Sequence, residues 1–171
     1  MSSRALTGGE IKILQFVFGS SLPYDRQQIT INAAHVGGID NSITYFHTPH
    51  YSPLIWCPDF SVPTAQQWTF VHEFGHVWQY YHGTAPIKGW LANFQRHPID
   101  YELNYPYDLT ASEYVEDYNI EQQASIVADY WFVSTNRAAQ KCTNPRPPSQ
   151  SDYLQLIADF QGYLAPATDD D

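Results

Sequence analysis

Apolar residues recur along the chain at spacings that predict both helices and short strands. Residues 8 to 18 carry apolar side chains every three or four positions, and Thr7 with Glu10 has the form of a capping box, so we expect a helix there. Residues 28 to 32 and 43 to 47 alternate with β-branched residues, which is typical of strands. The mixture predicts an α+β fold.

Prolines and glycines divide the middle of the chain. We expect Pro49 to end the second strand and the prolines between residues 48 and 63 to keep that segment irregular. A long helix is then predicted between Thr64, a candidate capping residue, and a stop at Gly83. Another helix is predicted over residues 119 to 136.

The weaker patterns lie between these helices and after them. A short helix is expected near residues 90 to 94 and a strand near residues 101 to 105. At 171 residues the chain has the length of one domain. We therefore divide a single domain, residues 1–171, into a catalytic core at 6–135, a Pro-rich loop at 141–151 and a C-terminal helix at 152–164.

Composition and charge narrow the function classes. A net charge of −10 argues against binding to nucleic acid or to an anionic membrane surface. We see no run of about 20 apolar residues that could span a membrane and no good signal peptide, so we expect synthesis in the cytoplasm. Cys57 and Cys142 have no metal-knuckle spacing; we favour two unpaired thiols over one bridge.

The chemistry is concentrated in an H-E-x-x-H motif, His72 to His76, inside the longest predicted helix. At about 100° per residue, His72 and His76 lie one turn apart on one face, so both imidazoles can reach a single ion. Glu73 follows His72 by one residue, about 100° further around the helix, where it reaches water at the metal instead of the metal itself. The motif predicts a zinc site in which Glu73 is the general base.

A catalytic zinc site needs a third protein ligand, and several residues compete for the role. His82 has the spacing of a third histidine in a metzincin motif, but Gln79 stands where that motif needs glycine, and Met1 is the sole methionine. We favour Glu121, with Glu113 and Glu116 as fallback ligands. Ala124, Ser125 and Ala128 follow Glu121 at helical spacing and form a stripe of small side chains. Such a stripe would let two helices approach closely enough for Glu121 to reach the histidines.

The segments "HEFGHVWQYYHG" and "DYNIEQQASIVADYW", with "LTGGE", "ITYF" and "PDFS" before them, resemble the zinc metallopeptidases associated with type VI secretion spike (valine-glycine repeat) proteins. The resemblance covers about residues 6 to 135. It implies a zincin-like, gluzincin-type domain, with a small sheet beside the motif helix and a second helix that brings Glu121 to His72 and His76. It also implies an antibacterial effector that acts in the envelope, or periplasm, of a neighbouring cell.

The expected reaction is amide hydrolysis, with zinc lowering the pKa of a water and Glu73 taking its proton. The substrate is a protein or peptide, with a peptidoglycan peptide among the candidates; a spike carrier and an immunity protein are the implied partners. The alternative is a zinc-stabilised, non-catalytic binding or adaptor module. Three tyrosines are lesser candidates for stabilising the oxyanion: Tyr80, Tyr114 and Tyr118. Asp117 and Asp129 are candidate hydrogen-bond partners of the zinc-bound histidines, and residues 43 to 47 are a candidate edge strand that pairs with the substrate. The remaining histidines are not expected to be metal ligands: His35, His47, His50 and His97.

Overall fold

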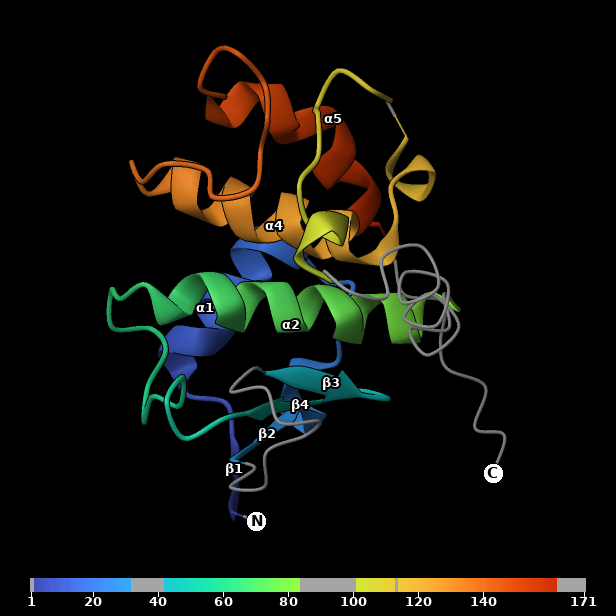
Figure 1. Cartoon of the computed structure of the whole chain (residues 1–171). Helices are drawn as coiled ribbons and strands as arrows, with labels where there is room; N and C mark the ends of the chain where they lie inside the picture. Colours follow the sequence, from blue (N-terminus) through green and yellow to red (C-terminus); the bar gives the residue numbers. More distant parts are fainter. Residues whose placement is uncertain (1, 32–41, 84–100, 113, 163–171) are drawn as a thin grey trace.

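The computed structural model describes residues 2–31, 42–83, 101–112 and 114–162. Its elements form tiers, in which helix α2 (Gln66–Tyr81) lies across the middle, a small sheet lies below it, and helices α4 (Ile120–Ser134) and α5 (Gln150–Phe160) lie above it (Figure 1). Helix α1 (Gly8–Phe18) lies behind α2 and contacts α2, α4 and α5. The tiers enclose α2 between the sheet and α4, and most of its residues are buried.

The sheet is small and mixed. Its strands are β1 (Ser2–Ala5), β2 (Gln28–Ile31), β3 (Ile43–Tyr45) and β4 (Thr48–Tyr51), in the order β1-β2-β4-β3. β2 and β4 are parallel, and the other two pairs are antiparallel. β3 is therefore an outer strand of this sheet, as predicted for residues 43 to 47.

The strand ends differ from the prediction at Pro49. This residue does not end the strand region; it lies inside β4, opposite Thr44 of β3. Phe46, with φ of 54°, and His47 form a tight turn in which Tyr45 pairs with Thr48, so the predicted strand is the first half of a hairpin.

Local capping explains where most of the helices begin. Thr7 and Glu10 form the expected capping box at the start of α1, and Asn119 forms one with Gln122 at the start of α4. Thr64 does not cap α2: the helix begins with Ala65 as its N-cap and makes no side-chain capping bond.

Three other expectations concern residues 90 to 94, residues 101 to 105 and the C-terminal helix. Tyr101–Asn104 is a turn of 3-10 helix and not a strand. α5 begins slightly earlier than expected, at Gln150, and ends at Phe160. Residues 90 to 94, where a short helix was expected, lie outside the described residues.

No helix of the described part is long and apolar enough to cross a membrane.

The contact between α2 and α4 is the most extensive helix pairing among the described residues, and it is tight. A Cβ added to Gly75 would lie 2.8 Å from Ala124 Cα and 2.9 Å from its Cβ. Ala124, Ser125 and Ala128 are fully buried, as the small-residue stripe predicted. This close approach brings the first turn of α4 to the motif histidines.

Candidate metal centre

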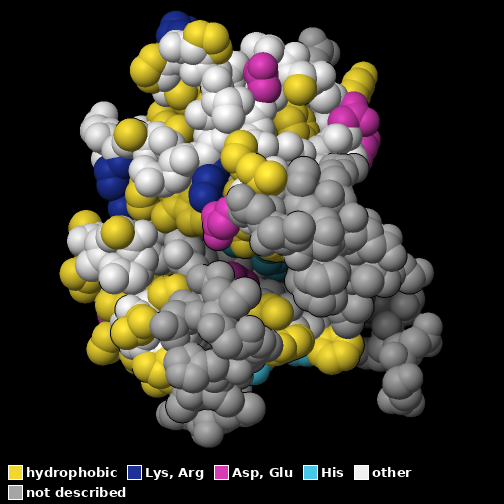
Figure 2. Space-filling view, in the orientation of Figure 1, with side chains coloured by type: hydrophobic (Ala, Val, Ile, Leu, Met, Phe, Trp, Pro, Cys, Tyr) yellow, Lys and Arg dark blue, Asp and Glu magenta, His cyan; other side chains and the backbone are white. Residues whose placement is uncertain are grey.

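Helix α2 presents the motif side chains to the interior. His72, Glu73 and His76 are only 3%, 5% and 8% exposed. The two imidazoles are one turn apart, with ring centroids separated by 4.9 Å. Figure 2 shows histidine and acidic side chains together at the floor of a hollow in this face of the molecule.

Glu121 reaches the histidine pair from the first turn of α4. Its Oε2 lies 3.1 Å from His72 Nε2 and 3.3 Å from His76 Nε2. Donors about 2.0–2.1 Å from a tetrahedral zinc ion are separated by about 3.3–3.4 Å, so these separations need little adjustment around an ion. The cluster His72, His76 and Glu121 could hold a metal ion, with ligand atoms that all lie within 4.8 Å of one another.

The electrostatics of the metal-free cluster are those of a buried ion pair. Burial disfavours the charged form of His76, but the adjacent Glu121 carboxylate outweighs it and raises the pKa of His76 to about 9. Burial likewise opposes ionisation of Glu121, yet His76 and His72 hold its pKa well below the usual range. The carboxylate is therefore ionised and available as a ligand, whereas His76 must lose a proton to bind a metal.

Glu73 is held apart from the three ligand residues. Its Oε2 accepts a hydrogen bond of 2.7 Å from Thr44 Oγ1, on the outer strand β3. Burial raises the pKa of Glu73, while His76, His72 and Thr44 oppose that rise. A buried carboxylate with a raised pKa beside a candidate metal site has the properties of a general base.

Two residues with no role predicted from the sequence, Gln79 and Tyr101, form hydrogen bonds that orient His76 and Glu121. His76 Nδ1 lies 2.8 Å from Gln79 Oε1, and the Gln79 amide donates onward to Ile120 O and Gln123 Oε1. The Tyr101 hydroxyl donates to Glu121 Oε1 at 2.7 Å, which leaves Oε2 facing the histidines. Gln79 lies at i+3 from His76, a helical spacing that could have identified it; Tyr101 had no such signal.

The other predicted ligands do not join the cluster. His82 stacks on Trp78 and its Nδ1 contacts Trp78 O, so the third-histidine alternative is not realised. Glu116 is exposed, and Glu113 lies outside the described residues. His47 and His50 lie on the sheet hairpin and are absent from the cluster, whereas His35 and His97 are also outside the described residues.

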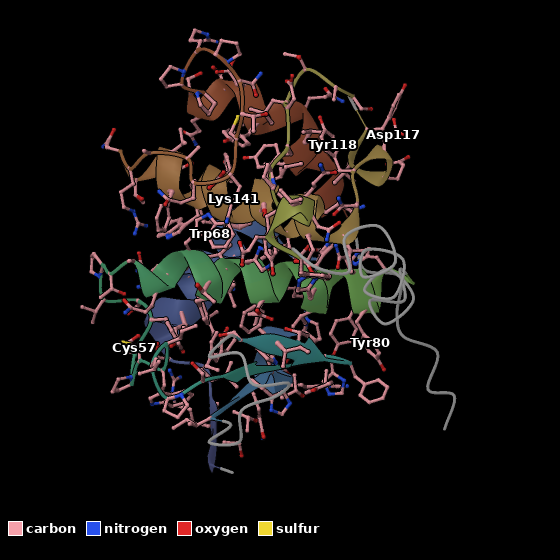
Figure 3. All side chains as sticks on the ribbon, viewed as in Figure 1. Cys57, Trp68, Tyr80, Asp117, Tyr118 and Lys141 are labelled. Atoms are coloured by element: carbon pink, nitrogen blue, oxygen red, sulfur yellow. The ribbon has the colours of Figure 1, made fainter. Side chains whose placement is uncertain are left out.

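The tyrosines and aspartates named from the sequence also have other contacts. Tyr118 donates to backbone carbonyls of Asp108 and Ser112, and Figure 3 shows it with Asp117 on the far side of α4 from the sheet. Tyr80 packs against Phe46 and His47, and Tyr114 is 60% exposed. The carboxylates bond elsewhere: Asp117 accepts from Ser112, and Asp129 from Trp68.

An α+β domain whose central helix pair brings two histidines and one glutamate into ligand geometry is a candidate metalloprotein. The comparisons with known proteins point to a relative. The type VI secretion system spike protein VgrG2b of Pseudomonas aeruginosa is 32% identical over 154 residues, a match that covers 85% of this chain and 14% of the spike protein. No protein-family model matches the chain.

A solved structure agrees with that match. The effector domain of Pseudomonas aeruginosa VgrG2b superposes with a TM-score of 0.66 and 28% identity, covering 78% of this chain and 76% of that one. The chain is thus homologous to the VgrG2b effector domain and spans about one seventh of the whole spike protein.

Proposed function

We propose that this chain is a zinc-dependent peptidase of the effector type, carried by a type VI secretion system. The observation that carries the proposal is the meeting of His72, His76 and Glu121 as a buried three-ligand set with Glu73 beside it. Among the described residues the cluster supplies three ligands, as in catalytic zinc sites, whereas structural sites close all four positions with protein ligands.

Each residue of the site has a separate role in the proposed amide hydrolysis. A zinc ion bound there would supply Lewis-acid chemistry, lowering the pKa of a water and polarising the scissile carbonyl. Glu73 takes the proton from that water at its Oε atoms and then gives it to the leaving amine. Thr44 keeps the Glu73 carboxylate oriented, and Tyr101 keeps Glu121 turned toward the histidines.

The effector role rests on homology. The similar solved structure is described as an effector domain, and the curated relative as a secretion spike protein. A target-cell envelope as site of action, a spike carrier and an immunity partner are part of the proposal, as is a protein or peptidoglycan-peptide substrate.

Zinc content is the first test. We would measure zinc per chain by elemental mass spectrometry in the native protein, in Glu121→Ala and in Glu116→Ala. We expect about one zinc in the native protein and in Glu116→Ala, whose exposed carboxylate is outside the cluster, and much less in Glu121→Ala. A native protein without zinc after zinc-replete purification would refute the metal site.

Glu73→Gln then separates an enzyme from a metal-stabilised binding module. The amide keeps the size of the side chain but cannot take a proton. We expect zinc and fold to remain while peptidase activity, and toxicity on export to the periplasm of a test bacterium, are lost. Unchanged toxicity in this variant would exclude the peptidase mechanism.

A further inference from the structure

The His72 ring is held in an unusual way. A metal-binding histidine usually donates its second ring N–H to a carboxylate, carbonyl or water, which fixes the ring orientation. His76 follows this rule through Gln79. His72 Nδ1 is buried and has no hydrogen-bond partner within the described part of the chain.

Two aromatic rings lie against His72 instead. The Trp68 ring stacks on it with centroids 4.9 Å apart and planes 22° apart. The Tyr105 ring lies 5.3 Å away at 24°. Two near-parallel rings at these distances restrict the rotation of the imidazole, so stacking can set the ring plane where the described residues supply no hydrogen bond to Nδ1.

Both rings are connected to a single carboxylate, that of Asp129. Asp129 Oδ1 accepts from Trp68 Nε1 at 2.7 Å, and Asp129 Oδ2 accepts from the Lys141 backbone N–H at 2.9 Å. The Lys141 ammonium lies 5.1 Å from the centre of the Tyr105 ring. Figure 3 shows Trp68 and Lys141 close together at the junction of α2 and α4.

Asp129 is well suited to anchor both sides. It is fully buried on α4, and it accepts three further hydrogen bonds, from the backbone N–H groups of Gln140 and Cys142 and from the Tyr107 hydroxyl. With five donors its carboxylate has little freedom to move. The same group thereby connects α2, α4 and the segment after α4.

We propose that Asp129 is a positioning residue for His72, acting through Trp68 directly and through Lys141 on Tyr105, the two rings that stack on the imidazole. The connection from Asp129 to His72 substitutes for the hydrogen bond that no described residue makes to His72 Nδ1. The expected effect of Asp129 on metal affinity rests on the proposed zinc site, whereas its effect on the orientation and mobility of the His72 ring does not.

The test compares two tryptophans that have the same kind of bond. Trp68→Phe keeps a ring beside His72 but loses the donor to Asp129. Trp131→Phe is the matched control, because Trp131 Nε1 also bonds between α2 and α4, to Gln67 Oε1, without contacting His72. Asp129→Asn, if it folds, leaves both stacking rings in place but keeps only one acceptor oxygen, so the bonds to Trp68 and to the Lys141 backbone N–H cannot both be kept in their present geometry.

Two measurements are made on each protein: the dissociation constant for Zn²⁺ by chelator competition, and the mobility of the His72 ring by ¹³C relaxation in the metal-free state. We expect Trp68→Phe and Asp129→Asn to weaken zinc binding about 10-fold or more and to loosen the ring. Trp131→Phe should change neither.

The outcomes separate the two proposals. Equal effects of Trp68→Phe and Trp131→Phe, or no effect of Trp68→Phe on either measurement, would overturn the role of Asp129. If the native protein binds no zinc, ring mobility alone decides: a rigid His72 that loosens in Trp68→Phe supports the role, and a ring unaffected by the change refutes it.

Discussion

Gly75, the residue before His76, should not tolerate even a methyl group. Helix α2 passes so close to α4 that the new Cβ would meet Ala124 Cα at 2.8 Å, Ala124 Cβ at 2.9 Å and Val127 Cγ2 at 3.3 Å. The first contact is with backbone, which cannot swing aside as a flexible side chain can. Gly75→Ala must therefore push the two helices apart.

The expected cost follows from two opposing terms. Alanine is favoured over glycine in a helix interior by about 1 kcal/mol, which would stabilise the variant. Overpacking of a close contact typically costs about 1–3 kcal/mol. Because the contact is with backbone, we take the upper part of that range and expect a net loss of about 1–2 kcal/mol in unfolding free energy, together with weaker metal binding as Glu121 moves from the histidines.

Urea unfolding and zinc competition measure the two effects. Gly8→Ala is the control, because its Cβ would meet nothing within 4 Å at the start of α1. Gly75→Ala combined with Ala124→Gly should recover part of the loss, since it removes the Cβ contact but not the one to Cα. A Gly75→Ala protein as stable as the native chain, with native zinc affinity, would show that the helices are not this close.

Four further predictions concern His76 and the groups around the cluster. Gln79→Leu removes the acceptor for His76 and should weaken zinc binding about 10- to 100-fold in chelator competition. Since the pKa of His76 is raised from 6.5 to about 9 in the metal-free protein, its pair with Glu121 should stabilise that protein fully below pH 6.5 and lose this contribution as pH rises toward 9. Zinc uptake at pH 7.5 should accordingly release about one proton from His76, measurable by calorimetry in buffers of different ionisation enthalpy. Thr44→Val removes a bond that lowers the pKa of Glu73, so the acidic limb of the pH–rate profile should move to higher pH while zinc content stays unchanged.

The start of a helix was predicted well where a capping residue in the sequence is followed by apolar residues at helical spacing. Thr7 with Glu10, and Asn119 at the start of α4, each combine a side-chain cap with an apolar repeat, and both helices begin where these residues indicate. Thr64 looked equally suitable, yet α2 begins without a side-chain cap. Burial between the sheet and α4 can hold a helix whose first turn is not optimally capped.

The ligand geometry was predictable because it depends on helix periodicity and on small residues. A motif at i and i+4 needs only a helix to place His72 and His76 together, and the small side chains after Glu121 indicated which helix could approach. The stacking of Tyr105 on His72 had no comparable signal. Its segment, expected as a strand, is a turn of 3-10 helix whose position depends on long-range contacts such as the one from Tyr101 to Glu121.

The position of Glu121 follows from constraints that reinforce one another. Asn119 fixes where α4 begins, the Gly75–Ala124 contact fixes how near α4 lies to α2, and the Gln79 amide ties the first turn of α4 to the helix that carries the histidines. These are capping, packing and hydrogen-bonding interactions that stabilise the helix pair itself. Because the same interactions also set the ligand separations, changes that loosen the α2–α4 contact around Gly75 and the first turn of α4 should reduce stability and metal affinity together, whereas a change at an exposed position outside this contact, such as Glu116, should affect neither.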